Sequence, residues 1–236
     1  MALNINNSIG GASNLTNYNT VIDSTGIINQ GADFGTNNTN KRLEAVTDFG
    51  VGSSNVSISM WIKINTQLTS GATTILAALR TSTTGLLYSV RYYNVAGTNY
   101  VRFYRTKLGV VDTYIDYAYT LSTSAFTHIV LTYDGTNITG YINGTSIGTL
   151  AASGTGTAST VLFNLGSYTT VQYSSSVIDE TAVWTKALIS TEVTSLYNSG
   201  AGLTYPLSGS LTTSLVSYFT FKTSLTQNSN FLQFFG

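Results

Sequence analysis

The stretch that most constrains the fold runs from Phe126 to Leu150, where two tight turns separate short alternating runs. Apolar and polar residues alternate over 127–133 and again over 138–142, with Asp134-Gly135 between them. Asn143-Gly144 then precedes a third run. Asp-Gly and Asn-Gly favour two-residue hairpin turns, because both turn residues tolerate positive φ. The pattern therefore predicts an antiparallel β-meander.

The same alternation recurs along the chain and predicts many short strands. Over 56–64 it places Val56 and its apolar neighbours on one face and Ser57, Ser59, Trp61 and Lys63 on the other. Further runs lie at 75–79, 86–94, 100–105, 110–119, 161–165, 177–184 and 214–221. Gly, Asn, Thr and Ser fill the gaps, as expected of turns. Regular short strands with turns between them favour an all-β sandwich.

One short helix is predicted near residue 190. Ser190 is suited to the N-cap, and Glu192 falls in the first turn, where the helix dipole favours a carboxylate. Val193, Leu196 and Tyr197 share one apolar face at helical spacing. Gly200 is then expected to end the helix.

Two segments resemble the laminin-G-like branch of the concanavalin A-like jelly rolls. The first resembles W-x-H-x-x-x-T-Y-D-G…Y-x-N-G, with Phe126 where the family usually has Trp; its matching residues are His128, Thr132, Tyr133, Asp134, Gly135, Tyr141, Asn143 and Gly144. The second resembles the family's I-D-E…W…A-L…E…L-Y…G run; its matching residues are Ile178, Asp179, Glu180, Trp184, Ala187, Leu188, Glu192, Leu196, Tyr197 and Gly200.

The resemblance implies a jelly-roll sandwich of two antiparallel sheets over residues 31–200, with Phe34 and Leu43 pointing inward. Residues 1–30 are then an N-terminal arm and first strand. Residues 201–236 hold a strand that either closes the sandwich beside the N-terminal strand or begins a second, truncated copy. The apolar tail, Phe231, Leu232, Phe234 and Phe235, is expected to pack on the domain or on a partner subunit.

Composition excludes several classes of function. Charged residues make up only 8% of the chain, and 10 basic residues balance 10 acidic ones. Such a chain has no basic patch to attract nucleic acid or an anionic membrane. It has no cysteine, so disulfides and thiolate sites are excluded. No run approaches the ~20 apolar residues that cross a bilayer. The first ten residues lack a basic, then apolar, signal-peptide pattern.

Catalysis is not expected. His128 is the only histidine, and it is interpreted as a strand residue at a sheet surface or a satisfied polar group of the core. A glycosidase needs two carboxyls about 5–9 Å apart. The family's glucanase run E-x-D-x-E is missing; Asp112 and Asp116 share a strand face but do not match it.

A calcium ion is the candidate cofactor, with Asp179 and Glu180 as its ligands. The alternative is that this pair anchors its strand to the adjacent helix through hydrogen bonds. Asp134 is interpreted as a turn former.

Half of the tyrosines lie between Leu86 and Tyr119. Alternation places Tyr100, Arg102 and Tyr104 on one face of their strand, and likewise Asp112, Tyr114 and Asp116 on the next. Adjacent antiparallel strands would join these six into one patch with Arg102 near an Asp. Tyr rings stack on sugars or fill protein interfaces. The patch is therefore the candidate binding face, and the alternative is an ordinary hydroxyl-tipped sheet surface.

These features favour a non-catalytic structural and adhesion domain on a particle surface, such as a bacteriophage decoration or fibre protein that binds glycans. Its expected partners are other virion proteins, a second copy of the chain, or a cell-surface glycan. The expected location is the virion surface, with an extracellular location as the alternative. The alternative function is a stand-alone carbohydrate-binding module that depends on calcium.

Overall fold

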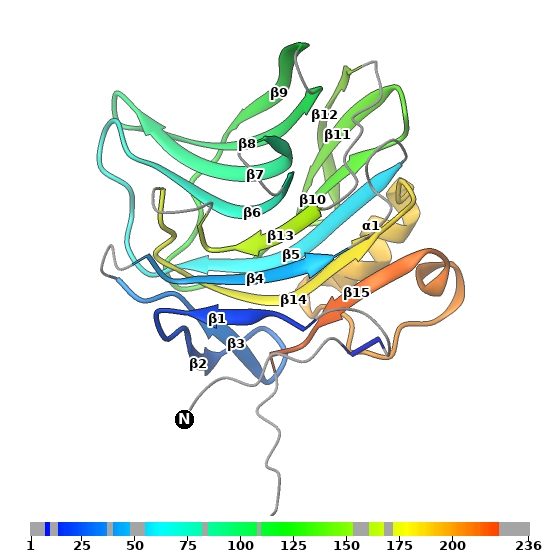
Figure 1. Cartoon of the computed structure of the whole chain (residues 1–236), viewed down its shortest axis with the longest axis horizontal. Coiled ribbons are helices and arrows are strands. Elements are labelled where there is room, and N and C mark those ends of the chain that lie inside the picture. Colours follow the sequence, from blue (N-terminus) through cyan, green and yellow to red (C-terminus); the bar gives the residue numbers. More distant parts are fainter. Residues whose placement is uncertain are drawn as a thin grey trace, which may run out of the picture.

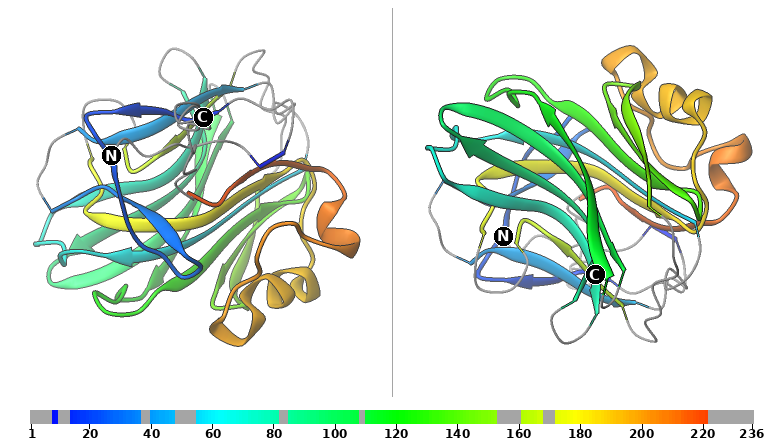
Figure 2. Two further views of the ribbon diagram at one scale, coloured as in Figure 1. Left: turned by 90° about the horizontal axis from the view of Figure 1, so that it is seen from below. Right: turned by 90° about the horizontal axis from the view of Figure 1, so that it is seen from above.

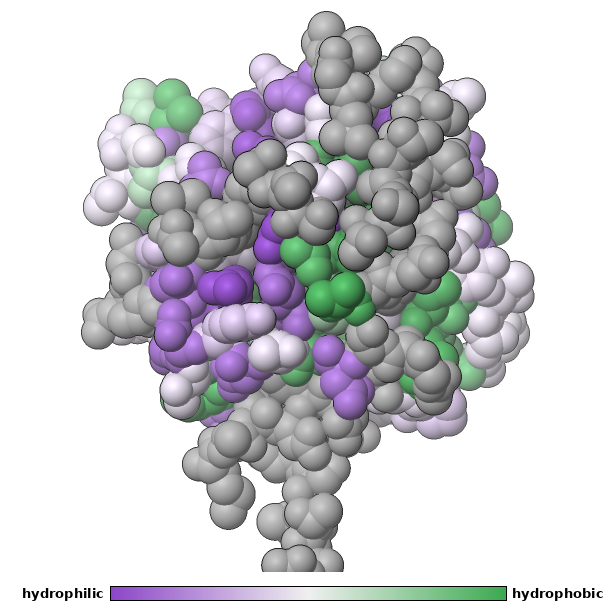
Figure 3. All heavy atoms as spheres, in the orientation of Figure 1, coloured by the Kyte–Doolittle hydropathy of each residue, from purple (hydrophilic) through white to green (hydrophobic). Residues whose placement is uncertain are grey.

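The computed structural model describes residues 8–9, 14–36, 40–47, 55–81, 85–107, 110–152, 161–167 and 172–221. These residues form two antiparallel sheets and one short α-helix, as the sequence predicts. The sheets stack as curved layers (Figures 1 and 2). Hydrophilic residues are interspersed with small hydrophobic patches on the described surface seen in Figure 3.

The first sheet has seven strands in the order β1-β4-β13-β6-β7-β8-β9. Their bounds are β1 Thr16–Tyr18, β4 Arg42–Thr47, β13 Val161–Leu165, β6 Thr73–Thr81, β7 Leu86–Val95, β8 Thr98–Lys107 and β9 Val110–Ala118. Strands β6 to β9 follow one another along the chain and form consecutive hairpins. Strand β9 therefore forms one edge of this sheet.

The second sheet has eight strands, ordered β12-β11-β10-β5-β14-β3-β2 with β15 also paired to β14. Their bounds are β12 Thr145–Ala151, β11 Asn137–Ile142, β10 Thr127–Tyr133, β5 Val56–Ile64, β14 Ser176–Trp184, β3 Gln30–Asp33, β2 Ile22–Thr25 and β15 Leu215–Phe219. The predicted meander is confirmed as β10-β11-β12. Asp134 is confirmed as a turn former, because its Oδ1 accepts the Thr136 and Asn137 N–H groups at 2.8 and 2.7 Å.

The main core lies between the two sheets. Val56, Ile58, Met60 and Ile62 contribute the inward face of β5, as their alternation predicts, and each is fully buried. Phe34 and Leu43 are also fully buried in this core, which confirms their predicted orientation. Burial of these side chains supplies the main hydrophobic stabilisation.

A second, smaller core lies on the outer face of the second sheet. Here α1, Ser190–Tyr197, packs with the 3₁₀ turn η2, Gly209–Thr212; the other 3₁₀ turn, η1, Asn198–Gly200, directly follows α1 and contributes no buried residue. Trp184 is fully buried in this cluster, and its Nε1–H donates to the Leu211 carbonyl at 2.8 Å. Trp61 of β5 and His128 of β10 also point outward from the second sheet, and they are buried because Tyr197 of α1 stacks over both rings.

Two details of the predicted helix are wrong. Ser190 is the first helical residue and Ile189 is the N-cap. The Ile189 N–H is satisfied instead by the Glu192 carboxylate, at 3.1 Å, so no side-chain cap is needed at 190. The helix ends before Gly200, because Asn198 adopts the left-handed conformation, with φ of 46°.

The C-terminal strand β15 pairs with β14, and the Ser8 N–H donates to the Tyr218 carbonyl at 2.8 Å. Residues 215–219 therefore extend the second sheet beside an N-terminal segment. The predicted assembly residues Phe231, Leu232, Phe234 and Phe235 lie outside the described residues. Within the described part of the chain, no helix is long and apolar enough to span a membrane.

Candidate ligand-binding face

The six predicted binding residues come together on the outer side of β8 and β9. Register places Arg102 opposite Asp116 and Tyr104 opposite Tyr114. Val101 and Phe103, which alternate with them, are fully buried in the main core. Strand β7 adds Arg91 and Tyr93 to the same side. We call this surface the Tyr–Arg face; its members are Arg91, Tyr93, Tyr100, Arg102, Tyr104, Asp112, Tyr114 and Asp116.

Arg102 lies at the centre of this face and is held from several directions. Its Nε–H and Nη2–H donate to the two Asp116 carboxylate oxygens at 2.6 and 2.7 Å. The guanidinium also lies 3.9 Å from the Tyr114 ring centroid and 4.8 Å from that of Tyr93. The pKa of Arg102 is raised, first by its hydrogen bond to Asp116. Such a bidentate, ring-stacked guanidinium is fixed in position.

The rings continue this arrangement across three strands. Tyr93 of β7 stacks on Tyr100 of β8, with ring centroids 5.2 Å apart. Tyr114 of β9 is 43% exposed. The face therefore carries an ordered series of tyrosine rings and two arginine side chains on the solvent side of the sheet. The predicted juxtaposition is confirmed; that these residues bind a ligand stays a prediction.

Tyr104 forms the more buried part of the face. The Arg91 guanidinium lies 4.2 Å from its ring centroid. Burial, and then a hydrogen bond to Asp112, raise the pKa of Tyr104 to about 12. Burial lowers the pKa of Arg91, while Tyr104 and Asp112 partly offset this. Both predicted carboxylates thus interact with neighbours on this face, Asp116 with Arg102 and Asp112 with Tyr104.

Sequence reasoning left Arg91 and Tyr93 out of the site, although a signal for them was present. Alternation over 86–94 places these two residues on one strand face. The short turn after Val95 sets Tyr93 opposite Tyr100.

A buried network farther across the same sheet was also missed: the Glu44 carboxylate accepts hydrogen bonds from Arg80 and Asn164 at 2.8 Å each. Burial raises the pKa of Glu44, but the hydrogen bonds from Asn164 and Arg80 outweigh this effect and lower it.

The predicted metal ligands are buried rather than exposed at a loop edge. Asp179 accepts from the Ile28 N–H at 3.1 Å and from the Glu180 N–H at 2.8 Å. Burial, and then the charge of Glu180, raise its pKa to about 8. Asp179 therefore anchors the β2–β3 turn, whereas the sequence suggested an anchor to the helix. Among the described residues no group of three or more His, Cys, Asp or Glu could hold a metal, so the calcium site stays a prediction.

His128 is buried beneath α1 and is only 1% exposed. Its Nε2 lies 2.8 Å from Ser59 Oγ, and its ring stacks on Trp61 at a centroid distance of 4.9 Å. Burial lowers the pKa of His128 to about 3. The cavity beside this pair measures about 10 Å³, room for roughly one water molecule. A substrate cannot enter it, so the Ser59–His128 pair is a packing feature.

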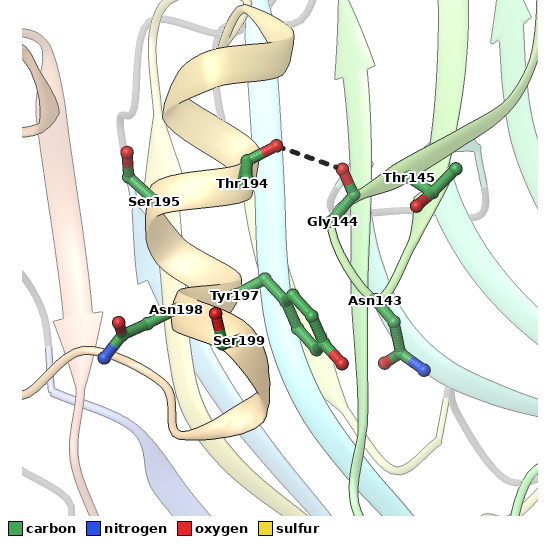
Figure 4. A pocket seen from close by; sticks show the side chains of 8 residues that line it. All are labelled: Asn143, Gly144, Thr145, Thr194, Ser195, Tyr197, Asn198 and Ser199. Carbon is green, nitrogen blue, oxygen red and sulfur yellow. Dashed lines mark hydrogen bonds between the residues drawn. The ribbon is translucent and has the colours of Figure 1, made fainter.

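An open polar hollow of about 450 Å³ lies between the β11–β12 turn and α1. Its lining residues are Asn143, Gly144, Thr145, Thr194, Ser195, Tyr197, Asn198 and Ser199, none of them charged (Figure 4). Thr194 Oγ1 donates to the Gly144 carbonyl at 3.3 Å and joins the two walls. The hollow is the second surface on which a ligand has room to bind.

This two-sheet sandwich is the architecture of the concanavalin A-like proteins, and the comparisons agree. Residues 34–194 match the family Laminin_G_3, described as the concanavalin A-like lectin/glucanases superfamily. Because the match covers more than half of the 236 residues, the chain belongs to this superfamily. No curated protein sequence matches the chain.

Several solved structures share the fold. The binding domain of botulinum neurotoxin serotype G has a TM-score of 0.64 at 16% identity, over 80% of this chain and 47% of that one. The binding domain of botulinum neurotoxin DC, in complex with SialylT, gives 0.63 at 15%, over 84% and 51%. The binding domain of Paraclostridial Mosquitocidal Protein 1 gives 0.62 at 18%, over 80% and 48%. The chain spans about half the length of these structures, and identities this low establish the fold alone.

Proposed function

We propose that this chain is a non-catalytic binding and adhesion domain that holds a glycan on its Tyr–Arg face. The observation that carries this proposal is the fixed series of rings and arginine across β7, β8 and β9, on the solvent side of a sheet. Tyr rings combine apolar contact area with a hydrogen-bonding tip, which suits a sugar. The fold is shared with structures that are described as binding domains, one of them in complex with SialylT, which supports binding as the function.

A glycan array of the full chain tests the proposal, read once with calcium and once with EDTA. We expect binding in both conditions. Tyr114→Ala should weaken it by about tenfold, or about 1.4 kcal/mol, because the variant removes an exposed ring that a sugar can pack against. Ser195→Ala, in the polar hollow, is the matched control and should bind like the original chain. An array without any bound glycan in either condition would overturn the proposal.

The same array distinguishes the proposed function from the alternative, a stand-alone carbohydrate-binding module that depends on calcium. A calcium-dependent carbohydrate-binding module would lose its signal in EDTA, and Asp179→Asn would lose it as well. The burial of Asp179 under the β2–β3 turn favours the calcium-independent outcome.

The setting that we propose for this domain is a particle surface, as a bacteriophage decoration or fibre protein. Two features support it: the balance of 10 basic and 10 acidic residues, and the absence of cysteine. Other virion proteins or a second copy of the chain are the proposed assembly partners. Mass spectrometry of density-purified particles from a lysate of the source culture is the test. Recovery of the chain only in the particle-free fraction would contradict this setting.

A further inference from the structure

The charges of the Tyr–Arg face cancel. It carries two arginines, Arg91 and Arg102, and two aspartates, Asp112 and Asp116. Each cation has its anion close by: Arg102 is paired bidentately with Asp116, and Asp112 lies near Arg91 and Tyr104. The face thus offers aromatic rings and hydroxyls, but no uncompensated positive charge among its described members.

The pairing at Arg102 also decides which sugars can use the guanidinium. Arginine binds a carboxylate best through two parallel N–H donors. Here Nε–H and Nη2–H already donate to Asp116, and Nη2–H lies 3.4 Å from the Tyr93 hydroxyl as well. Tyr93 and Tyr114 flank the guanidinium plane. An acidic sugar would therefore have to displace Asp116, or approach with its carboxylate beside a second negative charge, which is unfavourable.

Arg91 does not provide an alternative anchor. Its Nε–H donates to Ser89 Oγ at 3.1 Å, and its guanidinium lies over the Tyr104 ring. Asp112 also lies near it and favours its charge. A carboxylated ligand would meet this aspartate together with Arg91.

We infer that the Tyr–Arg face selects neutral glycans and rejects carboxylated ones, and that Asp116 is the residue that sets this selectivity by occupying Arg102. This inference rests on the proposed function, since it names the ligand class of the same face. In this inference Asp116 gives specificity through an unfavourable interaction with carboxylated ligands, which is one of the two ways a protein discriminates between ligands. Removal of that element should therefore create a new specificity rather than only weaken the old one.

The test uses an array of matched glycan pairs that differ by one carboxylated sugar, such as lactose and sialyllactose. The original chain should bind neutral members at least about tenfold more tightly than their carboxylated partners. Asp116→Asn should raise binding of carboxylated members by about tenfold, because it frees the charged donor pair of Arg102 for a carboxylate of the ligand. That new binding should weaken with added salt.

Asp134→Asn, in the exposed turn between β10 and β11 and outside the Tyr–Arg face, is the matched control. It makes the same chemical change and alters net charge equally, and an asparagine Oδ1 can still accept the Thr136 and Asn137 N–H groups. It leaves the Arg102–Asp116 pair in place, so it should not gain carboxylated ligands. Thermal unfolding of each variant establishes that it is folded.

Three results separate the inference from the proposed function. Equal binding of neutral and carboxylated partners by the original chain would overturn the inference and leave the function standing. An equal gain in Asp134→Asn and Asp116→Asn would show that net charge, rather than the occupied Arg102, decides selectivity, and would also overturn it. Failure of all three folded proteins to bind any glycan would overturn the proposed function, and the inference with it.

Discussion

The outer faces of the two sheets differ sharply, although both belong to one sandwich. The second sheet is covered by α1, η2 and the segment between them, and its outward residues, including Trp184, form a second core. The first sheet carries the Tyr–Arg face, where Tyr114 is 43% exposed. The same alternating strand pattern thus gives stability on one side and a surface for recognition on the other. Which outcome follows depends on whether a later part of the chain folds back over the strand.

The largest effect is expected for Trp184→Ala. This side chain is fully buried and hydrogen-bonded to Leu211. Its removal should lower the free energy of unfolding by about 3–5 kcal/mol. Tyr114→Ala, on the open face, should cost at most about 1 kcal/mol. Urea unfolding followed by tryptophan or tyrosine fluorescence measures both, and equal losses would contradict the contrast between the two faces.

Acid should lower the stability of the fold through His128, which lies on the covered outer face of the second sheet. The pKa of His128 falls from 6.5 to about 3 on folding, so the unfolded chain binds a proton more readily. Stability is therefore lost as pH falls through the window from 6.5 to about 3, by at most about 1.4 kcal/mol per pH unit from this group. His128→Gln should be less stable at pH 7 but lose less on going to pH 4.5. Urea unfolding midpoints at both pH values check this. Equal losses of stability in the two proteins would rule out His128 as a source of the acid sensitivity.

A smaller effect is expected where the helix begins. Glu192 accepts from the Ile189 N–H and from Lys186 Nζ, at 3.1 and 2.6 Å. Glu192→Ala should lower stability by about 1 kcal/mol. Ser190→Ala, at the residue that the sequence suggested as the cap, should leave stability almost unchanged, because Ser190 makes no capping bond. Thermal unfolding by circular dichroism compares the two; a larger loss in Ser190→Ala would reverse this assignment.

The smallest stability effect is expected for Arg102→Ala. The Arg102 and Asp116 side chains are 24% and 25% exposed, so solvent screens their attraction. A cost of at most about 1 kcal/mol follows. Urea unfolding measures it, and a loss as large as that of Trp184→Ala would show that the face is a structural network rather than a binding surface.

Much of the fold could be predicted from the sequence, because strand alternation and turn chemistry are local. Ser57 and Trp61 illustrate the limit. Their alternation correctly places them outward on β5, but their burial depends on segments that are distant in sequence. Ser57 hydrogen-bonds to Lys186 and Leu188, whereas Trp61 stacks on Tyr197 and lies beside Gly202. The Tyr–Arg face was predictable for β8 and β9, since each strand shows its own alternation. The pairing of Arg102 with Asp116 rather than Asp112 depends on register across the β8–β9 turn, which periodicity alone does not determine.

The most direct test of the binding face is a two-dimensional NMR titration of the labelled chain with the neutral glycan that gives the strongest array signal. The account predicts that amide shifts and line broadening concentrate on β7, β8 and β9, around Tyr93, Arg102 and Tyr114. Shifts concentrated instead on the hollow around Tyr197, with β7 to β9 unchanged, would contradict it.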